Sequence, residues 1–288
     1  MGRRRLDAEL VRRGLAGSRA EAEEAVRAGQ VIVRGAPATK TTTLVDVDEA
    51  LFVRGPARPF VSRGGPKLAA ALEAFAVDPS GRDCLDAGAS TGGFTDCLLQ
   101  RGARHIVAVD VGYGQLAWEL RTDPRVTVLD RTNIRELDPT TLPYRPSLVT
   151  ADLSFISLRS AIGSLVAIAA PRADLVLLVK PQFEAGRDDV GPGGVVADPR
   201  VWRRVIDDVA DAAAGAGAGV AGVICSPITG PAGNVEFLLH AEVGAPAVPG
   251  IGRVSRERRP ERTSRLHSQV DQRARCGPDL ARRMVDHL

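Results

Sequence analysis

Aromatic residues are scarce in this 288-residue sequence: they make up 4% of it, whereas hydrophobic residues as a whole make up 44%. The core must therefore consist mostly of Ala, Val and Leu. Long apolar runs are also lacking, because the best candidate, residues 161–170, ends at Pro171 and is shorter than a membrane helix. The N-terminus is charged and lacks the apolar segment of a signal peptide. We therefore expect a cytoplasmic protein without a membrane partner.

Cysteine is rare as well. The four cysteines are scattered, and their spacing matches neither a metal site nor a disulfide framework. We therefore expect no metal ion.

The charge is unevenly distributed along the chain. Residues 1–56 hold ten basic and eight acidic residues, and residues 243–288 hold ten and five. The middle of the chain is mildly acidic, with 18 basic and 22 acidic residues. Basic ends favour a polyanionic partner held by the flanks, and the alternative is ordinary solvated surface charge.

Residues 86–95 read D-A-G-A-S-T-G-G-F-T and form the most informative stretch. They follow the apolar pair Cys84-Leu85 and precede a helical pattern, which indicates a strand, a glycine turn and a helix start. Glycines allow positive φ and close approach to a ligand, and a helix N-terminus offers free N–H groups. The spacing Gly88-x-x-x-Gly92-Gly93 differs from the dinucleotide pattern G-x-G-x-x-G, which disfavours a nicotinamide oxidoreductase.

This turn resembles the first motif of S-adenosyl-L-methionine-dependent methyltransferases. The resemblance implies that the cofactor is S-adenosylmethionine and that a side chain at either turn glycine would occupy its space. The alternative is a glycine-rich turn without a ligand. The implied cofactor-binding residues are Asp86, Gly88, Ser90, Gly92 and Phe94.

Residues 1–56 read as a separate small module. Apolar residues at 6, 10, 11 and 15 form one face of a helix that ends at Gly14. Ser18, with Glu21 three residues later, predicts the start of a second helix over 20–28. Residues 31–35 and 44–47 read as short strands around a turn, and residues 51–53 as a third strand.

The pattern R-L-D-x-x-L-V-x-x-G-L-A-x-S-R-x-x-A, followed by G-x-V-x-V, resembles the α-L RNA-binding fold of ribosomal small-subunit protein four. In that fold the helix pair presents basic side chains to RNA phosphates and recognises shape more than base identity. About half of the candidates are expected only to solvate the helices. The candidate RNA-binding residues are Arg4, Arg5, Arg12, Arg13, Arg19, Arg34, Lys40 and Arg63.

Residues 57–62 are expected to be a short linker, stiffened by neighbouring prolines. From residue 63 to 243, apolar runs alternate with helical patterns, which predicts a doubly wound, mostly parallel sheet of the α/β class. The resemblance to methyltransferases implies that this sheet is the Rossmann-like class I methyltransferase sheet. Ligands in such sheets lie beyond the carboxyl ends of the strands. Polar residues are expected at these ends: Asp86, Asp110, Asp130, Asp152 and Lys180.

Asp110 lies 22 residues after Gly88, at the spacing where an acid accepts ribose hydroxyls. By resemblance to methyltransferases, Asp130 is expected near the adenine amine. Dehydrogenases share the Asp110 feature, so it does not discriminate between cofactors.

The fourth strand narrows the reaction class. It is followed by Asp152-Leu153-Ser154-Phe155, which lacks the proline-rich motif of amino-methylating enzymes and the Pro-Cys nucleophile of cytosine-carbon methyltransferases. The set Lys67, Asp152, Lys180 and Glu236 resembles the K-D-K-E tetrad of FtsJ-like RNA ribose 2′-O-methyltransferases. With the α-L module and the motifs S-R-G-G-x-K-L, V-K-P-Q-F-E and N-V-E-F, residues 4–243 resemble the TlyA family.

That family is described both as haemolysins and as rRNA cytidine 2′-O-methyltransferases. The resemblance implies methylation of a cytidine ribose in 16S or 23S ribosomal RNA, with ribosomal subunits and not DNA as partners. The alternatives are a non-catalytic ribosome-binding protein and a membrane-active haemolysin.

The chemistry fits the tetrad. A ribose hydroxyl must lose its proton as it attacks a sulfonium methyl, and a desolvated lysine such as Lys180 can act as the base. Asp152 and Glu236 can orient the lysines, and Lys67 can hold the substrate or steady the developing oxyanion. The alternative is a structural ion-pair cluster. The basic tail, residues 244–288, is expected to be disordered.

Overall fold

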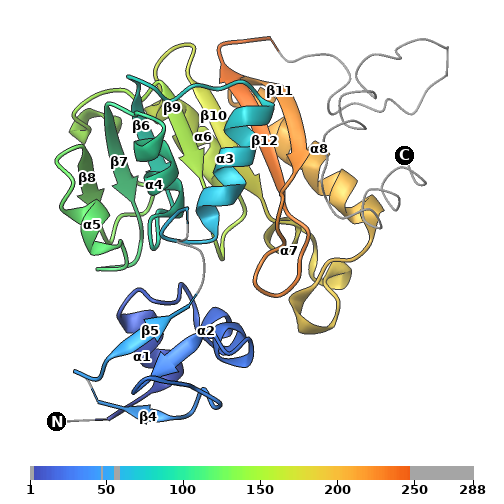
Figure 1. The fold of residues 1–288 in the computed structure, drawn as a ribbon. Coiled ribbons are helices and arrows are strands. Elements are labelled where there is room, and N and C mark those ends of the chain that lie inside the picture. Colours follow the sequence, from blue (N-terminus) through green and yellow to red (C-terminus); the bar gives the residue numbers. More distant parts are fainter. Residues whose placement is uncertain (1–2, 47, 55–58, 247–288) are drawn as a thin grey trace. The chain divides into compact units, whose positions relative to one another are not determined.

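The computed structural model describes residues 3–46, 48–54 and 59–246 (Figure 1). The expectation for the basic tail falls almost entirely outside these residues. The chain divides into two compact units, Met1–Arg63 and Gly64–Leu288. No helix among the described residues has the length and apolar character needed to cross a membrane.

The first unit packs two helices against short strands. Helix α1 (Leu6–Arg12) and α2 (Arg19–Arg27) bury an apolar core that includes Leu6, Leu10 and Val26. The expected cap is present, because Ser18 accepts a hydrogen bond from the Glu21 backbone N–H. The helix pair therefore forms where the apolar periodicity and the cap predicted it.

The strand pairing in this unit differs from the expectation. The segments at 31–35 and 44–47 do not pair around one turn. Strand β2 (Val31–Val33) pairs with β3 (Ala36–Pro37) and β5 (Leu51–Val53), whereas β4 (Leu44–Val45) pairs with β1 (Arg4–Arg5). The apolar patterns located β2, β4 and β5, but for strands of two or three residues they do not indicate which strands pair with each other.

The second unit contains a seven-stranded sheet in the order β11-β12-β10-β9-β6-β7-β8. Five strands run parallel: β6 (Asp83–Ala87), β7 (His105–Val109), β8 (Val126–Leu129), β9 (Leu148–Ala151) and β10 (Asp174–Val179). Strand β12 (Phe237–Val243) inserts antiparallel between β10 and β11 (Ala218–Cys225). This arrangement is the doubly wound α/β class that the alternating pattern predicted.

Helices cover both faces of the sheet (Figure 1). One face packs against α6 (Arg159–Ile168) and α8 (Pro199–Gly215), which share the main apolar core with the strands. The other carries α3 (Gly64–Ala74) and α4 (Gly93–Gln100), which pack on each other. Two short helices, α5 (Trp118–Arg121) and α7 (Pro181–Glu184), lie after β7 and β10, and three 3-10 turns span Pro139–Thr141, Arg187–Asp189 and Pro192–Gly194.

The strand order reverses between β6 and β9, which are neighbours although β7 and β8 separate them in sequence. In open α/β sheets the crevice beyond the carboxyl ends at such a reversal is where ligands bind. The glycine turn follows β6, and Asp152 follows β9. The topology therefore places the expected cofactor motif beside the expected catalytic acid.

Candidate active site at the carboxyl edge of the sheet

Lys180 lies directly after β10 and is 8% exposed. Its Nζ is 2.5 Å from Asp152 Oδ1 and donates a hydrogen bond to Ser154 Oγ at 2.8 Å. Because parallel strands β9 and β10 end side by side, the residues that follow them meet at this edge. The lysine thus has a carboxylate and a hydroxyl as acceptors, while its stem lies within the protein.

A second buried pair joins α3 to β12. Lys67 Nζ lies 2.5 Å from Glu236 Oε2, and both residues are buried. Val179 pairs with Phe237 across the β10–β12 ladder, so the next position on each strand brings Lys180 opposite Glu236. The structure therefore gathers the four expected residues as two adjoining ion pairs, each with one lysine and one carboxylate.

The glycine turn has the predicted positive φ angles: +80° at Gly88 and +101° at Gly92. Protein atoms already crowd both glycine positions. A Cβ at Gly88 would lie 2.5 Å from the Asp152 carbonyl oxygen, and one at Gly92 would lie 2.2 Å from Leu120 Cδ1. Backbone atoms therefore exclude a side chain at Gly88, and at Gly92 the ends of the Leu120 and Leu116 side chains would have to shift.

Asp86 is enclosed within the protein. It lies within β6, is fully buried, and accepts hydrogen bonds from Thr95 Oγ1 at 2.7 Å and Thr150 Oγ1 at 3.2 Å. Burial raises the pKa of this carboxyl to about 7. Phe94 is also buried. Both residues are buried beside the turn and support it, and their role in cofactor binding stays a prediction.

Asp110 and Asp130 lie at the ends of β7 and β8, as expected. Asp110 accepts hydrogen bonds from the backbone N–H groups of Ser90 and Gly112, at 2.8 and 2.7 Å. Asp130 Oδ2 accepts from Arg121 at 2.7 Å, and this hydrogen bond lowers the pKa of Asp130. Ser90 is exposed, with φ at +47°. The Asp110 carboxylate thus holds the glycine turn by the backbone N–H of Ser90, and the Asp110 side chain is half-buried beside the turn.

The basic residues of the first unit fall into two groups. Buried Glu9 accepts hydrogen bonds from Arg12 and Arg13 at 2.6–2.8 Å, and these bonds lower the pKa of Glu9 to about 2. Arg13 is half-buried and also donates to the carbonyls of Glu49 and Asp46, which makes it structural. Arg12 is itself exposed, as are the remaining candidates: Arg4, Arg5, Arg19, Arg34, Lys40 and Arg63.

Several exposed candidates also have carboxylate partners within the unit. Arg5 pairs with Asp7 at 2.7 Å, and Arg34 with Glu49. For Arg19 and Lys40 no ion pair is found in the described part of the chain. These two charges are therefore the most available to an anionic partner.

Sequence reasoning missed an aromatic pair beside Lys180. Phe155 is 89% exposed, has φ at +66°, and its ring centroid lies 5.6 Å from that of Phe183. Lys180 Nζ lies 5.7 Å from the Phe183 centroid. A second exposed aromatic, Tyr113, lies under the Arg131 guanidinium at 4.3 Å. The signal in the sequence was a large aromatic residue just beyond a buried strand, near two serines and the expected catalytic Asp152.

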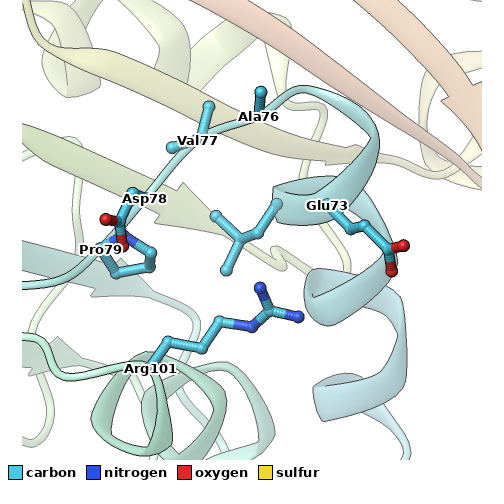
Figure 2. Close-up of a pocket in the computed structure, with 7 residues that line it drawn as sticks. Glu73, Ala76, Val77, Asp78, Pro79 and Arg101 are labelled. Carbon is cyan, nitrogen blue, oxygen red and sulfur yellow. The ribbon is translucent and has the colours of Figure 1, made fainter.

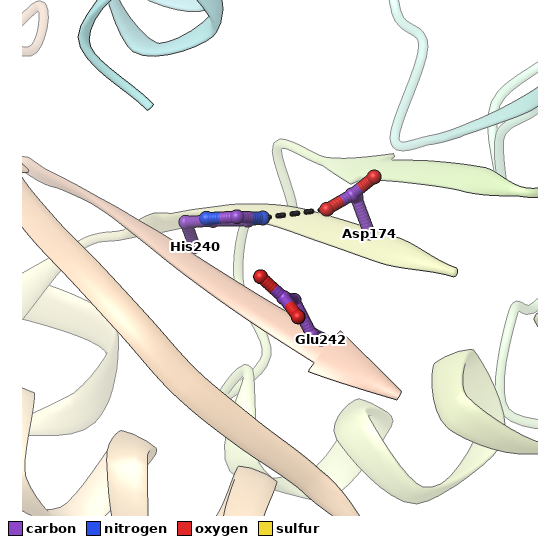
Figure 3. A group of neighbouring side chains, drawn as sticks. All are labelled: Asp174, His240 and Glu242. Atoms are coloured by element: carbon purple, nitrogen blue, oxygen red, sulfur yellow. Dashed lines mark hydrogen bonds and ion pairs between the residues drawn. The ribbon is translucent and has the colours of Figure 1, made fainter. Parts of the chain in front are cut away.

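Other features lie at the opposite edge of the sheet. Figure 2 shows an open pocket between the end of α3, the segment 76–79 and Arg101. Figure 3 shows Asp174, His240 and Glu242, at the start of β10 and near the end of β12. Asp174 accepts from His240 and from Arg82, both at 2.7 Å, so its carboxylate is already neutralised by protein groups. Neither feature contacts the two lysine pairs.

Comparisons with known proteins agree with this geometry. Residues 60–243 match the FtsJ-like methyltransferase family, and residues 4–51 match the S4 domain. The chain is 57% identical over 238 residues to the 16S/23S rRNA (cytidine-2′-O)-methyltransferase TlyA of Mycobacterium tuberculosis, covering 82% of this chain and 89% of that relative.

A second relative, Hemolysin A of Brachyspira hyodysenteriae, is 36% identical over 238 residues, covering 82% of this chain and 98% of its own length. Among solved structures, a protein from Streptococcus thermophilus described as a hemolysin is 38% identical with a TM-score of 0.73. That similarity covers 87% of this chain and 92% of that chain.

Proposed function

The chain belongs to the TlyA group of FtsJ-like methyltransferases, and we propose that it methylates a ribose 2′-hydroxyl of ribosomal RNA with S-adenosylmethionine as methyl donor. The observation that carries this proposal is a pair of contacts, each between a buried lysine and a carboxylate, beside the strand reversal. The printed activity of the Mycobacterium tuberculosis relative suggests a cytidine as the target. We infer a cytoplasmic location, where ribosomal subunits are available.

The residues around the crevice fit the cofactor. One buried side-chain oxygen, Gln182 Oε1, has no hydrogen-bond donor among the described residues, and Gln182 lies two residues after Lys180. Unsatisfied buried acceptors are costly, which favours a ligand that supplies donors. The turn from Gly88 to Gly92 would hold the amino-acid part, Asp110 the ribose hydroxyls and Asp130 the adenine end. The bound cofactor supplies a methyl group on a cationic sulfonium.

Lys180 is proposed to take the proton of the attacking ribose hydroxyl. A neutral lysine keeps one lone pair, and the hydroxyl of Ser154 and the carboxylate of Asp152 accept its N–H groups, so that the lone pair can face the substrate. Lys67, held by Glu236, would stabilise the negative charge that develops on the ribose oxygen. Alignment of the hydroxyl with the methyl group would supply much of the rate.

Phe155, which is exposed, packs against half-buried Phe183 and offers a surface for the base of the target nucleotide. Bases in single-stranded RNA stack on exposed aromatic side chains, and such a surface next to the base catalyst would orient the ribose. The S4 unit would bind RNA phosphates through exposed cations such as Arg19 and Lys40. The second unit would then supply the methyl-transfer chemistry, and the S4 unit would supply the affinity for RNA.

The test is to map 2′-O-methyl groups on rRNA from cells with and without the protein, and on purified subunits treated with protein and cofactor. The proposal requires a ribose methyl that depends on the protein in both experiments. If neither experiment detects such a methyl, the proposal is wrong.

A further inference from the structure

Two segments carry the groups proposed for catalysis, and each follows a parallel strand. The segment 152–158 follows β9 and contains Asp152, Ser154 and Phe155. Lys180 follows β10 and leads directly into α7. The position of one segment against the other sets the geometry around Lys180, so a contact that joins them controls that geometry.

Glu184, the last residue of α7, makes that contact. It is 6% exposed, and its carboxylate accepts hydrogen bonds from Ser157 Oγ at 2.5 Å, from the Leu158 backbone N–H and from Arg159 Nε at 3.2 Å. All three donors belong to consecutive residues at the end of the segment 152–158 and the start of α6. One buried carboxylate therefore holds the junction between the segment 152–158 and α6 by three hydrogen bonds.

Neighbouring contacts reinforce the same junction. Arg159 also donates to the Glu184 backbone carbonyl at 3.1 Å, and it pairs with Asp208 on α8 at 3.4 Å. Phe183, the residue before Glu184, contacts Phe155. The positive φ of Phe155 is a strained conformation for a residue with a side chain, and it persists only where its surroundings hold it.

We propose that Glu184 is a positioning residue for methyl transfer: its carboxylate holds the segment 152–158 so that Asp152, Ser154 and Phe155 face Lys180. This role rests on the proposed function. Glu184 does not touch the proposed reacting atoms, because its acceptors are consumed by Ser157, Leu158 and Arg159. Glu184 acts only through the position of the segment 152–158.

The substitution Glu184→Gln keeps the shape of the side chain but replaces one acceptor oxygen with an N–H donor group. At least one of the three protein donors then loses its acceptor, and the segment loosens. A misplacement of about 1 Å at reacting groups can cost about 10²-fold in rate. We expect the single-turnover rate of Glu184→Gln to fall by about 10–100-fold, with little change in cofactor affinity.

The matched control is Asp208→Asn. It removes the other carboxylate partner of Arg159 but leaves every contact of Glu184 in place. Ser157→Ala is the second test variant, because it removes a single donor and is less disruptive than a change at the buried carboxylate. We expect the control to match the wild type and Ser157→Ala to show a smaller loss in the same direction.

The experiment combines methyl transfer to ribosomal subunits with hydrogen–deuterium exchange of the full-length protein. Glu184→Gln should show faster exchange in residues 153–158, including the Leu158 amide, while amides of β6 and β10 stay protected as in the wild type. Wild-type methylation tests the proposed function itself. If the wild type methylates and both test variants keep the wild-type rate, or if exchange in residues 153–158 is unchanged, the positioning role is wrong.

Discussion

Lys180 and Asp152 come from the ends of two neighbouring parallel strands and meet with Nζ 2.5 Å from Oδ1. The lysine is almost fully buried, and across the β10–β12 ladder it lies opposite Glu236, which holds the second lysine, Lys67. Two lysines and two carboxylates thus share one edge of the sheet.

The first prediction concerns Gly88. Gly88→Ala should weaken both cofactor binding and catalysis, because its Cβ would lie 2.5 Å from the Asp152 carbonyl oxygen and displace the catalytic segment. Gly114→Ala is the control, since Gly114 also has positive φ, at +67°, but a Cβ there meets nothing within 4 Å. Both variants pay a backbone cost of about 1–2 kcal/mol. Calorimetric titration with S-adenosylmethionine and thermal unfolding should separate them, and equal losses in the two variants would contradict the steric explanation.

The second prediction concerns Asp86 and pH. Its folded-state pKa of about 7 lies above that of an exposed aspartate, so between about pH 4 and 7 the folded state binds more protons than the unfolded state. The contribution of Asp86 to stability is therefore fully present below pH 4 and is lost as the pH rises through 7. A pKa difference of this size corresponds to about 4 kcal/mol of folding free energy.

Asp86→Asn tests this directly. Urea unfolding at several pH values should give a flatter pH profile for the variant than for the wild type across this window. Parallel profiles would mean that Asp86 does not titrate in the folded protein.

The third prediction separates binding cations from structural ones in the S4 unit. Arg19→Gln and Lys40→Gln should weaken binding to ribosomal subunits, each reducing the slope of log affinity against log salt by about one unit, with no loss of stability. Arg13→Gln should instead lower stability, because Arg13 holds buried Glu9 and two backbone carbonyls. Salt titrations of RNA binding and thermal unfolding of all three variants distinguish the RNA-binding cations from the structural one. If Arg19→Gln and Lys40→Gln leave the salt slope unchanged, these residues do not contact RNA phosphates.

The sequence alone was sufficient to locate the strands of the larger sheet and to predict that Lys180 and Asp152 lie together. A lysine that ends an apolar run, as Lys180 does, is unusual at a surface, and the topology of a parallel sheet brings such strand ends together. The positive φ angles of the glycine turn were also predictable from the residue type.

Other features depend on contacts between distant segments. Asp86 was read as a strand end, but its strand continues to Ala87 and its carboxylate lies on the face that α4 covers, beside Thr95. Nothing in the sequence of β12 shows that it inserts antiparallel between β10 and β11. Glu184 reads as an ordinary helical acid until the fold brings its three donors to it.

The central claim is that Lys180 removes the proton from the ribose hydroxyl. Lys180→Ala should therefore lose methyl transfer while binding of cofactor and RNA is preserved. Lys180→Arg should fail as well, because a guanidinium does not deprotonate and is broader than an ammonium group. Lys40→Gln is the control: it also removes one lysine charge, but from the S4 unit, and should keep the single-turnover rate at saturating enzyme.

The most direct measurement is the single-turnover rate of tritiated-methyl transfer to ribosomal subunits by wild type and Lys180→Ala, with cofactor and RNA affinities measured in parallel. The predicted result is a loss of about 10²–10⁴-fold in rate with both affinities preserved. A near-normal rate in Lys180→Ala would remove Lys180 from the mechanism, and a loss of cofactor binding would make it a structural residue.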